Sequence, residues 1–86
     1  MRRRQTPKFI KRHDVVRLFE RYGCKVFAGR GKGSHFCLIR QYGGGELSFP
    51  FPYHREYGQD YIKPARRRLK LTEEDGISDD EFYRGF

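Results

Sequence analysis

The sequence has few cysteines, no tryptophan and no long apolar run. It contains two cysteines, Cys24 and Cys37, which are too few for a disulfide framework and do not show the spacing of a metal-binding knuckle. No segment approaches the ~18 consecutive apolar residues of a membrane-spanning helix. The arginines at the N-terminus are not followed by an apolar segment, which argues against a secretory signal. We therefore expect a cytoplasmic protein with reduced thiols, no membrane association and no metal or other cofactor.

Acidic residues are scarce in the first half of the chain. Residues 1–40 contain 12 Lys and Arg against 2 Asp and Glu, a net of +10, whereas residues 41–86 contain 7 against 9, a net of −2. A charge distribution of this kind favours a phosphate-bearing partner such as RNA. A basic surface that is merely solvated would have the same composition.

The length of 86 residues corresponds to one small domain. Because the chain contains 8 Phe and 6 Tyr, we expect a few large rings to supply most of the buried area. Residues 1–11 are basic and are interrupted by Pro7, which predicts a partly flexible N-terminal arm. Residues 12–86 then form the single domain.

A first amphipathic helix is predicted over residues 12–22. Val15, Leu18, Phe19 and Tyr22 recur at intervals of three and four, the spacing of one helical face. Gly23 follows at the position where helices commonly end in the left-handed conformation.

Three short strands are predicted next, over residues 24–28, 35–40 and about 46–51. Glycines lie in both connections, with 43–45 forming a hairpin loop. Leu47, Phe49 and Phe51 alternate and define the inner face of the third strand. Pro50 cannot donate a ladder hydrogen bond, so this strand is expected at an edge or to end early, and Pro52 ends it.

A second helix is predicted over residues 61–70. Ile62, Ala65 and Leu69 form its buried stripe, and Pro64 is expected in its first turn. The basic side chains of this helix are expected to be mostly exposed (Arg66, Arg67, Arg68, Lys70). A short helical turn follows, opened by Ser78 with Glu81 in the capping-box position, and attached to the body by Phe82. The predicted class is α+β, a three-stranded antiparallel sheet packed on two helices with a C-terminal helical turn.

The segment from Arg30 to His35 is the strongest functional signal. A basic glycine-rich turn, containing Lys32, Gly33 and Ser34, brings His35 to the start of a strand. An imidazole exchanges a proton near neutral pH, and the backbone amides and cations of such a turn bind phosphate. If Phe36 faces the helices, His35 projects from the opposite face of the sheet. This combination predicts acid–base chemistry on a nucleic-acid backbone.

Taken together, these motifs resemble the HicA family of toxin–antitoxin ribonucleases. The resemblance covers about residues 13–83 and includes Gly23, the Arg30 to His35 segment, Pro52-Tyr53-His54, and Gly76-Ile77-Ser78 through Glu81-Phe82. The chain departs from the family pattern in its longer arginine-rich N-terminus, in Pro64, and in extra acidic residues between Leu71 and Gly76.

The resemblance implies a double-stranded-RNA-binding-domain-like αβββα fold and metal-independent cleavage of mRNA, neutralised by a HicB-like antitoxin. The catalytic histidine of the family corresponds to His35. From the residues themselves, we expect phosphate contacts from Arg30, Lys32, Gly33, Ser34, Arg66 and Arg67. His54 is an acid partner of His35, a substrate contact or, more simply, a residue that fixes its loop by hydrogen bonding. The alternative function is a non-catalytic RNA-binding module of the same fold.

Overall fold

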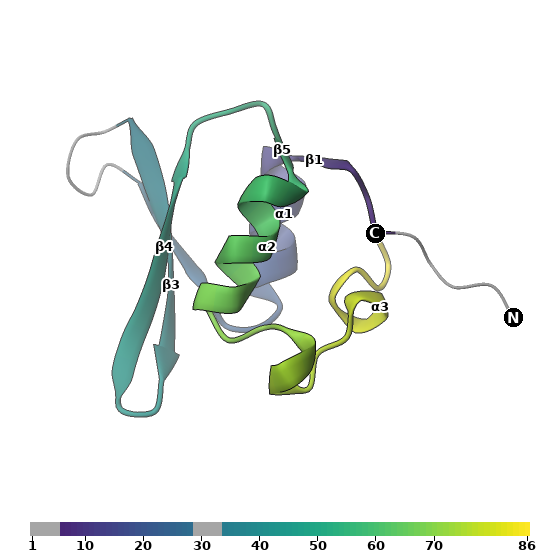
Figure 1. Cartoon of the computed structure of the whole chain (residues 1–86). Helices are drawn as coiled ribbons and strands as arrows, with labels where there is room; N and C mark the ends of the chain where they lie inside the picture. The colour runs from purple at the N-terminus through teal and green to yellow at the C-terminus, as the bar shows by residue number, and fades with distance from the viewer. Residues whose placement is uncertain (1–5, 29–33) are drawn as a thin grey trace, which may run out of the picture.

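The computed structural model describes residues 6–28 and 34–86 and shows an α+β domain (Figure 1). Its elements in chain order are β1 (Phe9–Lys11), α1 (Arg12–Glu20), β2 (Lys25–Ala28), β3 (His35–Tyr42), β4 (Gly45–Pro52), β5 (Glu56–Gly58), α2 (Gln59–Arg68), the 3-10 turn η1 (Glu73–Asp75) and α3 (Asp79–Phe82). The α+β class and the three-stranded antiparallel sheet, in the order β2-β3-β4, are confirmed.

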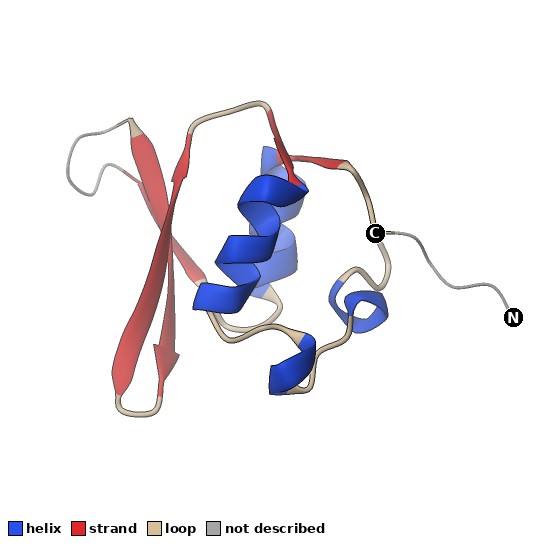
Figure 2. Cartoon of the chain, in the orientation of Figure 1, coloured by secondary structure: helices blue, strands red, loops and turns tan. Residues whose placement is uncertain are grey.

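The helices α1 and α2 cover one face of this sheet, and the view in Figure 2 shows both on the same side of the strands. α1 contacts β2 and α2 contacts β4. On β3, Phe36 and Leu38 point toward the helices and are buried, whereas His35 is exposed. Because side chains alternate along a strand, His35 and Cys37 belong to the outer face of the sheet, as predicted.

The β3–β4 hairpin turns at two glycines. Tyr42 pairs with Gly45, and Gly43 and Gly44 between them have φ angles of 57° and 84°. Positive φ at both central residues is the signature of a type I′ turn, which matches the twist of antiparallel strands and favours glycine. β4 lies at the edge of the sheet, where Pro50 breaks no central ladder, and it ends at Pro52, both as predicted.

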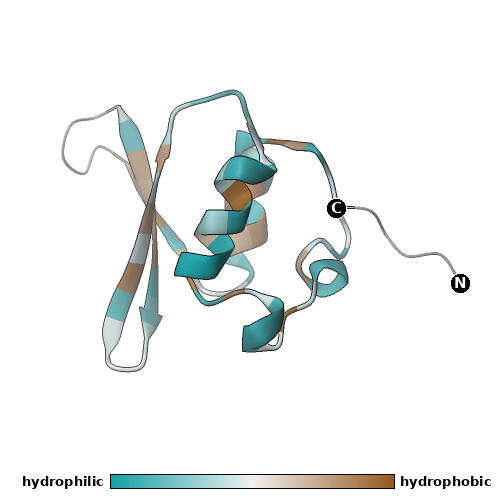
Figure 3. Ribbon diagram, in the orientation of Figure 1, coloured by the Kyte–Doolittle hydropathy of each residue, from teal (hydrophilic) through white to brown (hydrophobic). Residues whose placement is uncertain are grey.

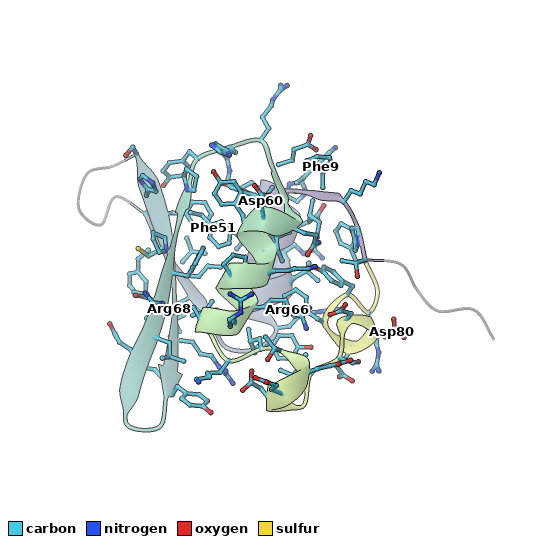
Figure 4. All side chains as sticks on the ribbon, in the orientation of Figure 1. Phe9, Phe51, Asp60, Arg66, Arg68 and Asp80 are labelled. Atoms are coloured by element: carbon cyan, nitrogen blue, oxygen red, sulfur yellow. The ribbon has the colours of Figure 1, made fainter. Side chains whose placement is uncertain are left out.

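Aromatic rings fill the space between the sheet and the helices. Figure 4 shows Phe51 between β4 and α2, and its ring centroid lies 5.1 Å from that of Tyr57, 5.5 Å from that of Phe36 and 6.3 Å from that of Phe19. All four of these side chains are buried. Figure 3 shows the matching pattern, with hydrophobic stretches on the strands and a hydrophilic last turn of α2.

A second, two-stranded sheet was not predicted. β1 pairs antiparallel with β5, so that Ile10 lies opposite Tyr57, and both side chains are buried in the core. Residues 9–11, which the sequence assigned to the N-terminal arm, therefore belong to the folded body of the domain. The tip of the predicted arm, residues 1–5, lies outside the described residues.

Both main helices end in the same backbone motif. After α1, the amide of Cys24 donates to Phe19 O and that of Gly23 to Glu20 O, with Gly23 at φ 86°. This is a Schellman arrangement, and it confirms the role predicted for Gly23. After α2, Leu71 and Lys70 donate in the same way, and Lys70 adopts φ 61° without being glycine.

The predicted start of the second helix was too late. α2 begins at Gln59 rather than Tyr61, so Pro64 lies inside the helix and not in its first turn. Proline lacks the amide that would bond to the carbonyl of Asp60, a loss that tertiary packing of Ile62 and Ala65 has to offset.

The prediction that Arg66 is exposed was wrong. Arg66 is 6% exposed, and Figure 4 shows its label between α2 and α3. The guanidinium donates to Leu71 O at 2.9 Å, to Ile77 O at 3.0 Å and to the Asp79 carboxylate at 2.6 Å. The C-terminal segment folds back over the helix and supplies these acceptors, which the helical periodicity of residues 61–70 does not reveal.

Candidate nucleic-acid site

His35 occupies the first position of β3 on the outer face of the sheet. It pairs with Pro52, the last residue of β4, so the histidine lies where both strands reach one end of the sheet. Phe36 and Leu38, on the inner face of the same strand, pack in the core. The backbone that carries His35 is therefore held firmly, while its side chain is exposed.

Ser34 contacts the imidazole directly. The distance from Ser34 Oγ to His35 Nδ1 is 3.0 Å, which is a hydrogen bond in either direction. If Nδ1 carries the proton and donates it to Oγ, Nε2 has a free lone pair and is a base. If the hydroxyl donates to Nδ1, Nε2 carries the proton and is an acid. Because the hydroxyl can donate or accept, this contact holds the ring in place with either tautomer.

His54 follows the same end of the sheet, two residues after Pro52. Its ring stacks on Tyr57 at 5.6 Å between centroids and meets Tyr61 edge-on at 5.5 Å. Its backbone amide donates to Tyr57 Oη, and its carbonyl accepts from Arg12 Nη1, each at 3.1 Å. The backbone of His54 thus makes the hydrogen bonds that hold this loop, which favours the loop role among the three alternatives predicted.

The other predicted phosphate contacts are distributed differently. Arg30, Lys32 and Gly33 lie outside the described residues. Arg67 is exposed on α2, as expected. Arg66 is buried in its ion pair with Asp79, so its guanidinium is committed to the protein and we remove it from the candidate phosphate contacts.

A cationic cluster that sequence reasoning missed lies at the start of α1. Lys11, Arg12, His13 and Arg55, together with Glu56, line a depression of about 550 Å³. The β1–β5 pairing sets Lys11 opposite Glu56, and the amide of Arg12 donates to Arg55 O at 3.0 Å. Lys11 and Arg12 are neighbours in the sequence, whereas Arg55 comes from a distant segment that the pairing of two unpredicted strands brings beside them.

The thiols are both free, Cys24 buried and Cys37 half-buried. Burial raises the pKa of Cys24 to about 11, against a smaller lowering by Arg40. Among residues 6–28 and 34–86, no three His, Cys, Asp or Glu side chains are arranged to hold a metal ion. No helix in these ranges is long and apolar enough to cross a membrane.

The candidate nucleic-acid contacts therefore lie in three separate places: an exposed imidazole paired with a serine on the outer face of the sheet, an exposed arginine on α2, and a cationic depression beside α1. Comparisons with models of protein families, with curated proteins and with solved structures find no match for this chain.

Proposed function

We propose that this protein is a metal-independent endoribonuclease in which His35 is the general acid–base residue. The observation that carries the proposal is the exposed His35 on the outer sheet face, with Ser34 Oγ 3.0 Å from Nδ1. An exposed imidazole at a strand end, held by one hydrogen bond on one ring nitrogen, leaves the other nitrogen for proton exchange with a substrate.

RNA carries its own nucleophile, so such a site needs no residue that attacks the phosphate. His35 Nε2 takes the proton of a 2′-hydroxyl, whose oxygen forms a bond to the adjacent phosphorus. The bond from phosphorus to the 5′-oxygen breaks, and that oxygen takes up a proton as it leaves. The products are a 2′,3′-cyclic phosphate and a 5′-hydroxyl. The cations and amides of the Arg30 to Ser34 segment are proposed to stabilise the charge that develops on the phosphate.

The sequence resemblance supports the wider biological proposal. The motifs from Gly23 to Phe82 occur in the order found in HicA toxins, which implies a double-stranded-RNA-binding-domain-like arrangement of the sheet and helices, mRNA as the substrate and a HicB-like antitoxin as the partner. The observed sheet of three antiparallel strands with α1 and α2 on one face is compatible with that arrangement. We propose that the protein acts in the cytoplasm, where its substrate would be found.

The test is cleavage of one long RNA in excess EDTA by wild-type protein and by His35→Ala. The matched control is Gln41→Ala, an exposed outer-face position at the opposite end of the same strand. We expect His35→Ala to reduce the cleavage rate by at least ~10²-fold, the lower end of general acid–base contributions, while Gln41→Ala cleaves normally. Cleavage by His35→Ala at the wild-type rate would refute the assignment of His35.

A non-catalytic RNA-binding module is the second candidate, because the exposed cations around Arg12 and Arg55 serve binding equally well. It predicts RNA binding that weakens steeply with salt and intact RNA in the same assay. Intact RNA with the wild-type protein, together with salt-sensitive binding, would favour this module over the nuclease.

A further inference from the structure

A second depression lies between α1 and the inner face of β2, next to the cationic cluster. We call it the α1 cleft. Its apolar wall consists of Val16, Val26, Ala28, Phe36 and Tyr53. Its volume of about 420 Å³ falls within the ~300–1,000 Å³ typical of small-ligand pockets.

Two arginines of α1, Arg12 and Arg17, border this apolar wall beside His13, whose Nε2 lies 3.5 Å from the Asp14 carboxylate. Arg12, His13 and Arg17 from α1 complete the lining, and Arg12 and His13 also line the cationic depression beside it. The two depressions are therefore adjacent along α1. Among the described residues, Glu56 is the one acidic side chain in these two linings, and it lines the cationic depression but not the α1 cleft.

Tyr53 forms the aromatic part of the wall. It is 43% exposed, its ring centroid lies 5.3 Å from that of Phe36, and the guanidinium of Arg12 lies 5.6 Å from the ring centre. A half-exposed ring that is fixed from behind by a buried ring is a stacking surface for another planar group. The guanidinium of Arg12 lies over this ring in a cation–π contact and also donates to His54 O, so a planar cation and the ring together form the surface offered to a base.

We propose that the α1 cleft binds one unstacked base of a single-stranded RNA, with Arg12 and Arg17 contacting the phosphates that flank it. An apolar, aromatic floor with a cationic border is complementary to a nucleotide, which presents a flat ring beside an anion. The same chemistry does not suit an apolar peptide, which would leave the arginines unpaired. This proposal rests on the proposed RNA substrate, and it adds the place on the protein where the RNA strand is bound.

The position of the cleft relates it to His35. Ala28 pairs with Phe36, the residue after His35, and Tyr53 follows Pro52, the residue opposite His35. The cleft thus lies at the same end of the sheet as the candidate catalytic residue, on its inner rather than its outer face. A base bound in the cleft places the neighbouring RNA backbone at this end of the sheet. The cleft then contributes to the base preference of the nuclease close to the cleaved bond.

The test uses full-length protein with His35→Ala, so that the RNA stays intact. A single-stranded hexaribonucleotide with one 2-aminopurine is titrated, and its fluorescence is measured because stacking on Tyr53 quenches it. We expect saturable quenching. The same hexaribonucleotide with an abasic site in place of the 2-aminopurine should compete with this probe about tenfold less well than an unlabelled oligonucleotide that keeps a base there, within the range known for base–aromatic stacking.

Two variants address the cleft itself. Val26→Glu adds a negative charge at a partly exposed wall position, and Gln41→Glu makes the same charge change on the outer face at the far end of the sheet. We expect Val26→Glu to abolish the quenching and weaken binding at least tenfold more than Gln41→Glu. Arg17→Gln, an exposed substitution that removes no core contact, is expected to weaken binding and to lower its salt dependence.

The outcomes separate this inference from the nuclease proposal. RNA binding that is indifferent to the abasic site, and equal for Val26→Glu and Gln41→Glu, would overturn the base-binding role and leave the cleft to a protein partner. Base-dependent binding by a wild-type protein that cuts no RNA would refute the nuclease proposal alone and support the cleft. Absence of RNA binding at low salt would overturn both.

Discussion

At the scale of single residues, the proposed chemistry depends on which nitrogen of His35 carries the proton. Ser34 Oγ is the group within hydrogen-bond distance of Nδ1, and a base at Nε2 requires that Nδ1 donate to that oxygen. Ser34 is then a positioning residue: it touches the catalytic ring and acts through it. The sequence identified both residues, because a glycine-rich turn before an alternating strand places them at its start.

Ser34→Ala is expected to lower the rate of RNA cleavage by about two- to tenfold, the equivalent of one net hydrogen bond of roughly 0.5–1.5 kcal/mol. It is also expected to shift the acidic limb of the pH–rate profile, which a purely structural effect would not do. The control is Ser48→Ala, an exposed serine on the neighbouring strand. Cleavage rates measured from pH 5 to 9 that coincide for Ser34→Ala and wild type would contradict the role of Ser34.

The two cysteines are expected to differ in reactivity. Burial raises the pKa of Cys24 to about 11, so its thiol stays protonated in the native protein, whereas Cys37 is partly accessible. Iodoacetamide at pH 8, followed by mass spectrometry, should modify Cys37 in the native protein and both cysteines in urea. Because burial raises the pKa of Cys24 above the ordinary thiol value of 9.0, its contribution to stability is complete below pH 9 and is lost as the pH rises toward 11.

At the scale of elements, Arg66 connects α2 with the linker that follows it and with α3. It binds carbonyls from the linker that follows α2 and the carboxylate of Asp79 at the start of α3, and its guanidinium lies 4.4 Å from the Phe82 ring centre. The Ser78 cap of α3, which the sequence predicted, is confirmed by a 3.1 Å bond from the Glu81 amide. Ile62, Ala65, Arg66 and Leu69 have the spacing of one helical face, so the sequence pattern already distinguishes Arg66 from Arg67 and Arg68. The pattern does not reveal the acceptors of Arg66, which come from the C-terminal segment.

Arg66→Ala is expected to lower the free energy of unfolding by about 2–4 kcal/mol, because it leaves buried carbonyls and a carboxylate without their partner. Arg67→Ala, an exposed neighbour on the same helix, should change it by less than ~0.5 kcal/mol. Urea unfolding followed by circular dichroism measures both. Equal stability of the two variants would show that the Arg66 contacts do not hold the C-terminal segment.

The same ion pair predicts how stability depends on acid. The hydrogen bond from Arg66 lowers the pKa of Asp79 below the ordinary value of 3.8 for an aspartate. A lowered folded pKa contributes stability that is present above pH 3.8 and is lost as the pH falls through the folded value. Asp79→Asn should therefore reduce stability at pH 7 and flatten its decline below pH 4, as followed by thermal unfolding from pH 2 to 7. A wild-type decline that Asp79→Asn leaves unchanged would exclude this pair as its source.

The short strands β1 and β5 show the limit of local patterns. Each contains three residues, and each gains its hydrogen bonds only from the other. A segment of three residues is too short to show alternation, so Phe9–Lys11 is indistinguishable from a basic arm until Glu56–Gly58 is placed beside it. The longer strands β3 and β4 were predictable because their alternation and the glycine turn agree.

At the scale of the whole molecule, the positive charge is concentrated by folding. The sequence already shows a net of +10 in residues 1–40 and −2 in the remainder. The fold adds Arg55, from the acidic half, to Lys11 and Arg12 around one depression beside the α1 cleft. A cluster built in this way is a candidate phosphate track, whereas the acidic residues of η1 and α3 lie on the C-terminal segment.

The logarithm of the RNA-binding constant is expected to fall linearly with the logarithm of the salt concentration. Each phosphate contacted on a single strand contributes about −0.7 to the slope. Lys11→Gln and Arg55→Gln should each weaken binding and reduce the slope by about this amount. Arg84→Gln is the control, because that exposed arginine is paired with Glu81 on α3. Binding constants for a short single-stranded RNA at several KCl concentrations test this, and equal slopes for all three variants would place the phosphate track elsewhere.

The sequence by itself determined the α+β class, the strand order of the main sheet, the ends of α1 and the hairpin, and the presentation of His35 on the outer face. These features depend on contacts between neighbours in the chain and on the alternation of apolar residues, which local spacing encodes. The tertiary structure decided the acceptors of Arg66, the β1–β5 pairing, and the grouping of Lys11, Arg12, Arg55 and Tyr53 around two adjacent depressions. These depend on segments separated by tens of residues, whose contacts exist only once the core around Phe51 has packed.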